Sequence, residues 1–281
     1  MIAIADSGST KADWAFVEQG GERADCHSMG LNPYFHSSDF IRETLMGIDG
    51  ISGRAAAVTE VYFFGAGAST DVLKEVVAKG LRMVFPNAKV LVRHDLDGSA
   101  FATCYGGKGI ACILGTGSNS CIFDGEEVSE EIPALGHILG DEGSGSYIGK
   151  QLLRDFFYKK MPADVSAAFA SFSKLDKDGV IEKVYQGENV NVYLASLCVF
   201  LEDFRDEDYT KQLLINSFTD FLDIHVSCYA NWWEYPVHFT GSVAFYFKTE
   251  LEMAVAAFGA KMGRIEQRPI DGLVEYFGPD S

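Results

Sequence analysis

Two glycine-containing turns in the chain could hold phosphate groups through their backbone amides. Each follows a short apolar run and combines glycine with serine or threonine, at residues 6–11 and 115–119. Glycine lets the backbone approach an anion closely and point several N–H groups at it, and the hydroxyl side chains add further donors. The candidate phosphate-binding residues are Gly8, Ser9, Thr10 and Lys11 in the first turn and Gly115, Thr116 and Gly117 in the second.

An aspartate, Asp6, opens the first turn, where a phosphate would repel its charge. This carboxylate is compatible with a phosphate site if it holds Mg²⁺ through water, so it predicts a metal. Neither turn is a Walker loop, and neither is a Rossmann fingerprint, because a strand rather than a helix follows the turn. Either turn alone is more simply a tight hairpin. Two such turns in equivalent positions favour a nucleotide site.

The charge of the chain limits its partners. There are 40 acidic and 23 basic residues, which gives a net charge of −17. Such a surface repels phosphate backbones and anionic membranes, so we expect no nucleic-acid or membrane partner. A nucleotide site must gain positive potential from backbone N–H groups, a lysine or a divalent cation. The start of the chain lacks the basic region of a signal peptide, and the six cysteines form no Cys-x-x-Cys pair, so a cytoplasmic protein with reduced thiols is expected.

The elements around the two turns are a pair of hairpins, one opening each half of the chain. Strands are expected at 2–6 and 12–17, where Trp14 and Phe16 lie on one face and Asp13 on the other, and again at 110–114 and 120–123. We interpret this as a structural duplication. Residues 143–233 have apolar side chains at helical spacing, so the second half is helix-rich. A chain of 281 residues suits two modest domains, with a seam near 106–109.

The remaining elements connect and cover these hairpins. We expect further strands at 23–29, 61–64, 89–93 and 237–240, and helices at 35–46, after Ser69 or Thr70, after Asp95, from Gly241 to Phe258, and from Pro269 to the end.

Two more segments make a family resemblance specific. They are Gly-His-Ile-Leu-Gly-Asp-Glu-Gly-Ser at 136–144 and Gly-Ser-Val-Ala at 241–244. With the two turns, they resemble the N-acetylglucosamine kinase branch that is grouped with the BadF/BadG/BcrA/BcrD ATPases in the actin/hexokinase/Hsp70-like superfamily. The resemblance runs from Ile2 to about Phe277. It implies an α/β fold with two ribonuclease H-like (actin-like ATPase) domains around a cleft, namely 1–107, joined by the last helix at about 268–281, and 108–267.

The resemblance implies ATP-dependent phosphorylation of a small sugar, N-acetylglucosamine or a related amino sugar, with ATP and Mg²⁺ as cofactors. A homodimer is left open. Asp95 matches the general base of the family, and Asp97 is its rival, although from the residues alone either acid is as readily a helix cap. The resemblance further implies sugar contacts at Asn32, Ser118, Gly136 and Asp141, adenosine-side contacts at Gly241 and Ser242, and a water-mediated magnesium contact at Asp6.

One residue departs from the family pattern. The family usually has tryptophan before the Gly-His pair, whereas this chain has Leu135, which cannot form the same flat wall with a hydrogen-bond donor. The identity of the sugar is therefore left open. Two other functions remain as alternatives. One is an ATPase that activates an acyl-CoA reductase or dehydratase, although its Cys-Ala-Ala-Gly-Thr-Gly segment is absent here; the other is a sugar sensor without catalysis.

Overall fold

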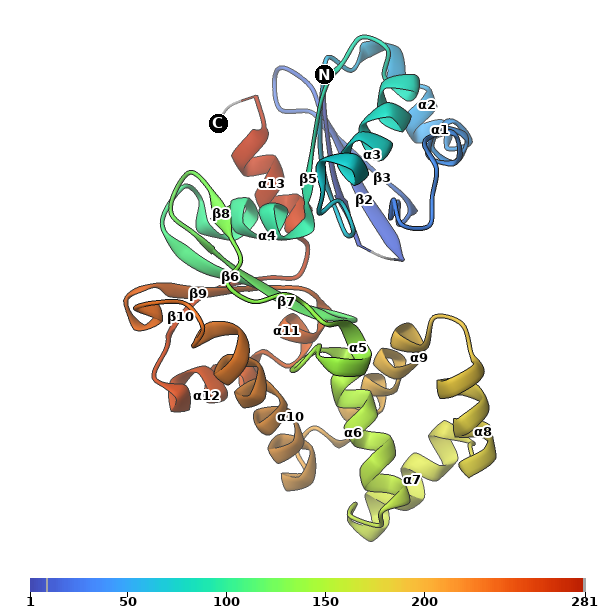
Figure 1. The fold of residues 1–281 in the computed structure, drawn as a ribbon, viewed down its shortest axis with the longest axis vertical. Coiled ribbons are helices and arrows are strands. Elements are labelled where there is room, and N and C mark those ends of the chain that lie inside the picture. The colour runs from blue at the N-terminus through green and yellow to red at the C-terminus, as the bar shows by residue number, and fades with distance from the viewer. Residues whose placement is uncertain (9, 280–281) are drawn as a thin grey trace. The chain divides into compact units, whose positions relative to one another are not determined.

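The computed structural model describes residues 1–8 and 10–279, and this part of the chain divides into two compact units. Unit 1 comprises Met1–Gly107 and the chain from Arg268 onward, and unit 2 comprises Lys108–Gln267. Within the described residues each unit is built on one five-stranded mixed sheet (Figure 1). The α/β architecture with a helix-rich second half is confirmed.

The sheet of unit 1 has the order β3-β2-β1-β4-β5. Its strands are β1 (Ile2–Ser7), β2 (Lys11–Val17), β3 (Arg23–Met29), β4 (Glu60–Gly65) and β5 (Lys89–His94). β1 pairs antiparallel with β2 and parallel with β4, and β4 pairs parallel with β5. The register places Ser7 opposite Gly65 and Gly65 opposite His94. The carboxyl ends of β1, β4 and β5 therefore lie in one row, where ligands commonly bind α/β sheets.

Helices cover both faces of this sheet. They are α1 (Ser38–Met46), α2 (Asp49–Ser52), α3 (Asp71–Val84), α4 (Asp95–Cys104) and α13 (Pro269–Phe277). On one face, Ile41 of α1 and Leu81 of α3 are buried in a core with the rings of Trp14 and Phe63. The apolar spacing of α3 thus serves to seal the sheet, as the sequence predicts.

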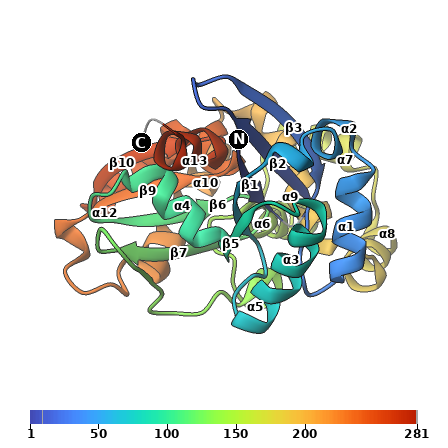
Figure 2. The ribbon, with the colours of Figure 1, turned by 90° about the horizontal axis from the view of Figure 1, so that it is seen from above.

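The last helix, α13, packs on the other face beside α4 and the N-terminal strands (Figure 2). Pro269 is at its first turn, as expected. The rings of Phe64, Phe101 and Phe277 meet there with centroids 5.3–5.9 Å apart. Gly272 has no space for a side chain, because an added Cβ would lie 2.2 Å from the carbonyl oxygen of Ala102. The end of the chain is therefore an integral part of unit 1.

The sheet of unit 2 has the order β10-β9-β6-β7-β8. Its strands are β6 (Gly109–Leu114), β7 (Ser118–Phe123), β8 (Val128–Ser129), β9 (Pro236–Thr240) and β10 (Lys261–Glu266). β6 and β7 form the expected hairpin, and β9 pairs parallel with β6. The edge strand β10 was not predicted. Its residues do not alternate clearly, and its pairing with β9 shifts register between Met262 and Ile265.

Helices make up most of the rest of unit 2, and some of them pack against this sheet. The α-helices of unit 2 are α5 (Gly136–Leu139), α6 (Gly145–Phe157), α7 (Ala163–Ser173), α8 (Lys177–Ile181), α9 (Val190–Ser196), α10 (Asp208–Phe221), α11 (Ser242–Tyr246) and α12 (Lys248–Phe258). Leu152 of α6, Phe218 of α10 and Leu251 of α12 are buried against β6 and β9 in one core. No helix among the described residues is long and apolar enough to span a membrane.

Two predicted helices have different bounds in the structure. The first begins at Ser38 rather than near residue 35, because the Ser37 side chain accepts a hydrogen bond from the Phe40 amide and caps it. The helix predicted from Gly241 to Phe258 is two helices, α11 and α12, separated at Phe247. Residues 32–36 in unit 1 and Phe247 in unit 2 are therefore not helical.

Candidate active site

The first glycine turn, in unit 1, is held by its neighbours at the carboxyl end of β1. The Ser7 carbonyl accepts from the Ala66 amide at 2.8 Å, and the Ser7 hydroxyl accepts from the Leu31 amide at 3.0 Å. The Thr10 carbonyl accepts from the Gly30 amide at 3.0 Å. The predicted residue Ser9 lies outside the described residues. Gly8 and Thr10 are exposed, so an anion can reach this turn.

Lys11, predicted to bind phosphate, begins β2 with a largely exposed side chain. Its Nζ lies 2.8 Å from Asp13 Oδ1. An exposed ion pair of this kind contributes little to stability, so the ammonium group can leave Asp13 for a stronger anion. The Lys11 side chain can therefore bind an anion at the first turn, although the structure does not fix it there.

Asp6 is partly buried among other acids. Burial and the nearby charges of Asp95 and Asp13 raise the pKa of Asp6 to about 7. A cation beside Asp6 would offset this repulsion, so the carboxylate suits a divalent metal held through water. Among the described residues no group of three or more His, Cys, Asp or Glu side chains could hold a metal ion by itself. The fit for Mg²⁺ therefore rests on Asp6.

Asp95 and Asp97 have different surroundings at the start of α4. Asp97 accepts a hydrogen bond from the His94 amide at 3.1 Å and pairs with Arg93 at 3.2 Å, so it caps the helix. Asp95 is the first helical residue, and its side chain keeps 26% of its exposure. Its Oδ1 lies 3.1 Å from His94 Nδ1. Of these two acids, Asp95 is thus the one that can meet a ligand, and it lies at the end of the row shared with the first turn.

Asn32 also lies at this edge of unit 1. Its Oδ1 accepts from the Tyr34 amide at 3.0 Å. The side chain rests against Gly67, where an added Cβ would lie 2.4 Å from Oδ1, and Gly67 has a positive φ of 81°. Gly65 is the last residue of β4 and Gly67 follows it, and the sequence predicted only that a strand ends here. The structure makes this segment the support on which Asn32 lies.

The second glycine turn, in unit 2, is braced by the start of α6. The Gly115 amide donates to the Gly117 carbonyl at 3.0 Å and closes the turn. The amides of Gly145 and Ser146 donate to the carbonyls of Gly115 and Thr116 at 2.8 and 3.0 Å. The turn carbonyls are therefore occupied by α6, which stops them from facing an incoming anion.

Ser118 and Asp141 are both predicted sugar contacts. Hydrogen bonds link their two segments inside unit 2. The Ser118 amide donates to Asp141 Oδ1 at 3.3 Å, and its hydroxyl donates to the Glu142 carbonyl at 2.7 Å. Ser146 Oγ donates to Asp141 Oδ2 at 3.4 Å. Burial raises the pKa of Asp141, against the opposing effects of Ser118, Ser146 and the cationic side chains nearby. Asp141 has a φ of 61°, so these bonds hold it in a strained conformation.

Gly136 begins the short helix α5 with a φ of 69°. The Lys150 ammonium donates to the carbonyl of His137 and ties α5 to α6. Glu142 lies 3.2 Å from Nε2 of the buried His225. The whole 136–146 segment is thus fixed to helices behind it, and His137 is bound through its backbone.

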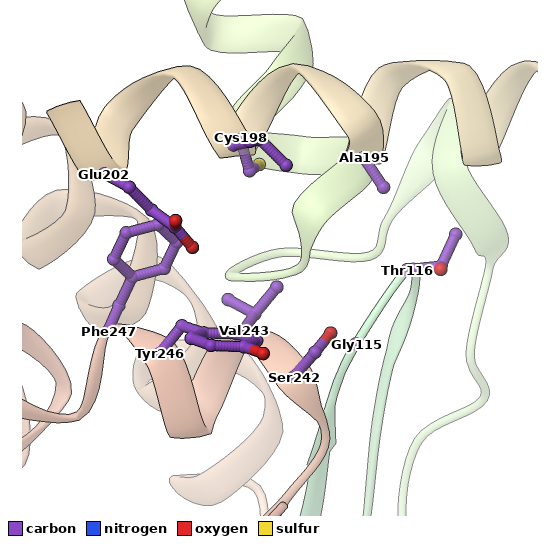
Figure 3. Close-up of a pocket in the computed structure, with 10 residues that line it drawn as sticks. Gly115, Thr116, Ala195, Cys198, Glu202, Ser242, Val243, Tyr246 and Phe247 are labelled. Atoms are coloured by element: carbon purple, nitrogen blue, oxygen red, sulfur yellow. The ribbon is translucent and has the colours of Figure 1, made fainter.

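A pocket of about 150 Å³ opens beside the second turn, wholly within unit 2. Figure 3 shows Ala195, Cys198 and Glu202 on one helical wall, facing Val243, Tyr246 and Phe247 on the other. Gly115, Thr116 and Ser242 lie at one end. An apolar slot that ends at a glycine turn suits a flat base with phosphates attached.

A partly buried ion pair joins the segments next to the two walls of this pocket. Arg205, next to the first wall, donates to both carboxylate oxygens of Glu250 on α12, at 3.1 and 2.9 Å. Glu250 is 2% exposed. The Arg205 guanidinium also lies over the Phe247 ring, 5.9 Å from its centroid. Bidentate pairing holds the Arg205 and Glu250 side chains in a defined geometry beside the pocket.

The start of α11 determines how closely Ser242 approaches the turn. Gly241 has a φ of 107°, and an added Cβ would lie 2.5 Å from the carbonyl oxygen of Leu114. Only glycine fits there, and Ser242 then lines the pocket. The predicted residues Ser242, Gly115 and Thr116 are thereby brought together.

Sequence reasoning missed the walls of the pocket. The run 192–204 reads as one buried helix, but the structure divides it into α9 and the 3₁₀ helix Leu197–Phe204. Val199 and Glu202 are exposed on that 3₁₀ helix and line the pocket. Tyr246 and Phe247 come from another segment. The signal in the sequence was a pair of charges, Glu202 and Asp203, near the end of an apolar run.

Comparison with known proteins gives a full-length match. No family model matches the chain. A solved structure from Porphyromonas gingivalis, provisionally designated an N-acetylglucosamine kinase, is 36% identical, with a TM-score of 0.92 and 98% coverage of both chains. A similarly designated protein from Chromobacterium violaceum is 18% identical, with a TM-score of 0.69 and 98% coverage of both. A ROK family glucokinase from Streptomyces griseus, solved with glucose and AMPPNP, is 12% identical with a TM-score of 0.56, covering 97% of this chain and 98% of its own.

These likenesses, together with two sheets that each carry a glycine hairpin, define the actin-like ATPase fold of sugar kinases. The identity and coverage of the Porphyromonas gingivalis match are high enough to go beyond the fold. The chain belongs to the family of N-acetylglucosamine kinase-like proteins.

The acidic surroundings of Asp6 predict a pH-dependent stability. The pKa of Asp6 is about 7 in the folded protein against an ordinary value of 3.8, so ionisation of Asp6 costs stability as the pH rises from about 4 to about 7. Asp6→Asn removes this cost. The melting temperature of the variant minus that of the wild type should therefore increase across this window, measured without nucleotide or divalent cation.

Asp39→Asn is the matched control, since it removes an exposed carboxylate from the same unit. It should leave the pH dependence unchanged. A difference between Asp6→Asn and wild type that stays constant from pH 4 to pH 7 contradicts the assigned environment of Asp6.

Proposed function

We propose that this protein transfers the γ-phosphoryl group of ATP to a hydroxyl of a small sugar, N-acetylglucosamine or a related amino sugar. The observation that carries the proposal is the accessibility of the Asp95 carboxylate. Its carboxylate is partly exposed in line with the first glycine turn, whereas Asp97 is occupied as a helix cap. The 36% identity to the Porphyromonas gingivalis protein over 98% of both chains supports an amino sugar as the acceptor.

In this reaction Asp95 is the general base. It accepts the proton of the sugar hydroxyl as that oxygen attacks the γ-phosphorus, and the bond from this phosphorus to the bridging oxygen of ADP breaks. Asn32, supported by Gly67, offers an amide that can orient a sugar hydroxyl. Ser118, Gly136 and Asp141 are the proposed sugar contacts of unit 2. Their rigid hydrogen bonding suits a site that orients its substrate before reaction.

The nucleotide is proposed to bind through both glycine turns. Gly8, Thr10 and Lys11 contact phosphate from unit 1, and Gly115, Thr116 and Gly117 do so from unit 2. The adenosine moiety occupies the slot beside Gly241 and Ser242. Asp6 would hold Mg²⁺ through water, and the bound ion would neutralise part of the phosphate charge.

Replacing the proposed base separates catalysis from binding. Asp95→Asn keeps the size of the side chain but removes its basicity, so kcat should fall by about 10²–10⁴-fold with N-acetylglucosamine and magnesium-ATP. The Kd for ATP, measured by calorimetry, should stay within about twofold of wild type, which is under about 0.4 kcal/mol.

Asp97→Asn is the matched control two residues away. It weakens a helix cap and should cost about 0.5–2 kcal/mol of stability while leaving most of the turnover. Full activity of Asp95→Asn would refute the assigned base. A wild-type protein that binds amino sugars but never phosphorylates them would instead favour the sensor.

Filling the slot tests the nucleotide site separately. Val199 lines the pocket and is 59% exposed, so Val199→Trp can extend into the slot without disturbing the core. The KM for ATP should rise at least about tenfold, or about 1.4 kcal/mol, with the KM for sugar unchanged. Val72→Trp, at an exposed position on α3 of unit 1, is the control and should alter neither value. Unchanged ATP affinity in Val199→Trp would exclude this pocket.

A further inference from the structure

Two aromatic side chains are exposed in unit 1 between β3 and α1. Tyr34 is 63% exposed and Phe35 is 81% exposed. Both follow Asn32, whose side chain lies against Gly67 at the edge of the sheet where the proposed ligands bind. Aromatic rings held in water present a large apolar surface that gains free energy when it is covered.

The segment that carries these rings has a defined conformation. The Asn32 side chain accepts from the Tyr34 amide at 3.0 Å, and the Asn32 carbonyl accepts from the amides of Phe35 and His36 at 3.1 and 3.0 Å. The His36 ring stacks on Phe40 with centroids 4.5 Å apart. The rings are therefore exposed on an ordered turn, so the backbone that carries them loses little conformational entropy when a ligand binds.

The same turn is attached to the edge that carries the first phosphate turn. The Leu31 amide donates to the Ser7 hydroxyl at 3.0 Å, and the Gly30 amide donates to the Thr10 carbonyl at 3.0 Å. Asn32 rests on Gly67 at the end of β4. The aromatic turn is thus continuous, within one unit, with the row of strand ends where Asp95 lies.

We propose that Tyr34 and Phe35 form an aromatic platform that binds the apolar surface of the sugar acceptor and makes the site selective for N-acylated sugars. The proposal rests on the proposed function. A pyranose has a C–H face as well as a hydroxyl rim, and an N-acyl group adds a methyl. Phe35 has no polar atom and favours these apolar parts, while the Tyr34 hydroxyl can bond to a polar group at the rim.

The test measures sugar binding and turnover in Tyr34→Ala, Phe35→Ala and the double variant. We expect the KM for N-acetylglucosamine, and its Kd by calorimetry, to rise at least about tenfold in the double variant, while the Kd for ATP is unchanged. The preference for N-acetylglucosamine over glucosamine, expressed as the ratio of kcat/KM values, should narrow. Tyr34→Phe retains the ring and should lose less than Tyr34→Ala.

Tyr185→Ala is the matched control, because Tyr185 is 80% exposed but belongs to unit 2. It should change none of these values. An unchanged sugar Kd in the double variant overturns the platform and leaves the proposed function standing. The platform is also overturned if the double variant loses self-association by sedimentation while its sugar affinity is unchanged, since the rings would then contact a second copy.

The converse result separates the two proposals. A wild-type protein that binds N-acetylglucosamine without phosphorylating it refutes the kinase function, and a weaker sugar Kd in the double variant still supports the platform. A wild-type protein that binds no sugar in the panel of N-acetylglucosamine, glucosamine, N-acetylmannosamine, N-acetylmuramic acid and glucose overturns both.

Discussion

Binding of a polyanion by a strongly acidic chain is the constraint on which this structure depends. With a net charge of −17, the surface repels a triphosphate unless backbone N–H groups supply local positive potential. In the proposed function, glycine turns at strand ends supply it without adding charge. In unit 1 the parallel register of β1, β4 and β5 aligns Ser7, Gly65 and His94. This alignment determines which other residues of unit 1 lie beside the proposed anion site. That alignment places three features at one edge of the sheet: the first glycine turn, the Gly67 segment that supports Asn32, and the carboxylate of Asp95.

The same edge concentrates negative charge, and the structure gives each acid a distinct environment. Asp97 is neutralised by Arg93 and by the start of α4, whereas Asp6 is left among like charges with a pKa of about 7. Such a difference between neighbouring carboxyl groups is typical of sites that handle protons or cations. In unit 2 the corresponding turn is stabilised differently, since the amides of Gly145 and Ser146 occupy its carbonyls. Rigidity there comes from α6 rather than from strand register.

The sequence predicted the parts of the fold that depend on short segments. The hairpins, the helix-rich second half and the last helix at Pro269 follow from local alternation, helical spacing and turn residues. The edge strand β10 was missed because its pattern is irregular. The pocket was missed for a different reason: its walls come from residues 195–202 and 242–247, which only the tertiary fold brings together. The order of the turn at 32–36 depends likewise on contacts with Ser7, Thr10 and Gly67.

Hydrogen–deuterium exchange of the full-length protein with a non-hydrolysable ATP analogue and Mg²⁺ tests the central claim most directly. If backbone amides of both turns hold the triphosphate, exchange should slow together at residues 8–11 and at residues 115–118, with protection also at the 195–202 wall of the pocket. Protection that is absent from both turns, or confined to one of them at saturating nucleotide, would contradict the account.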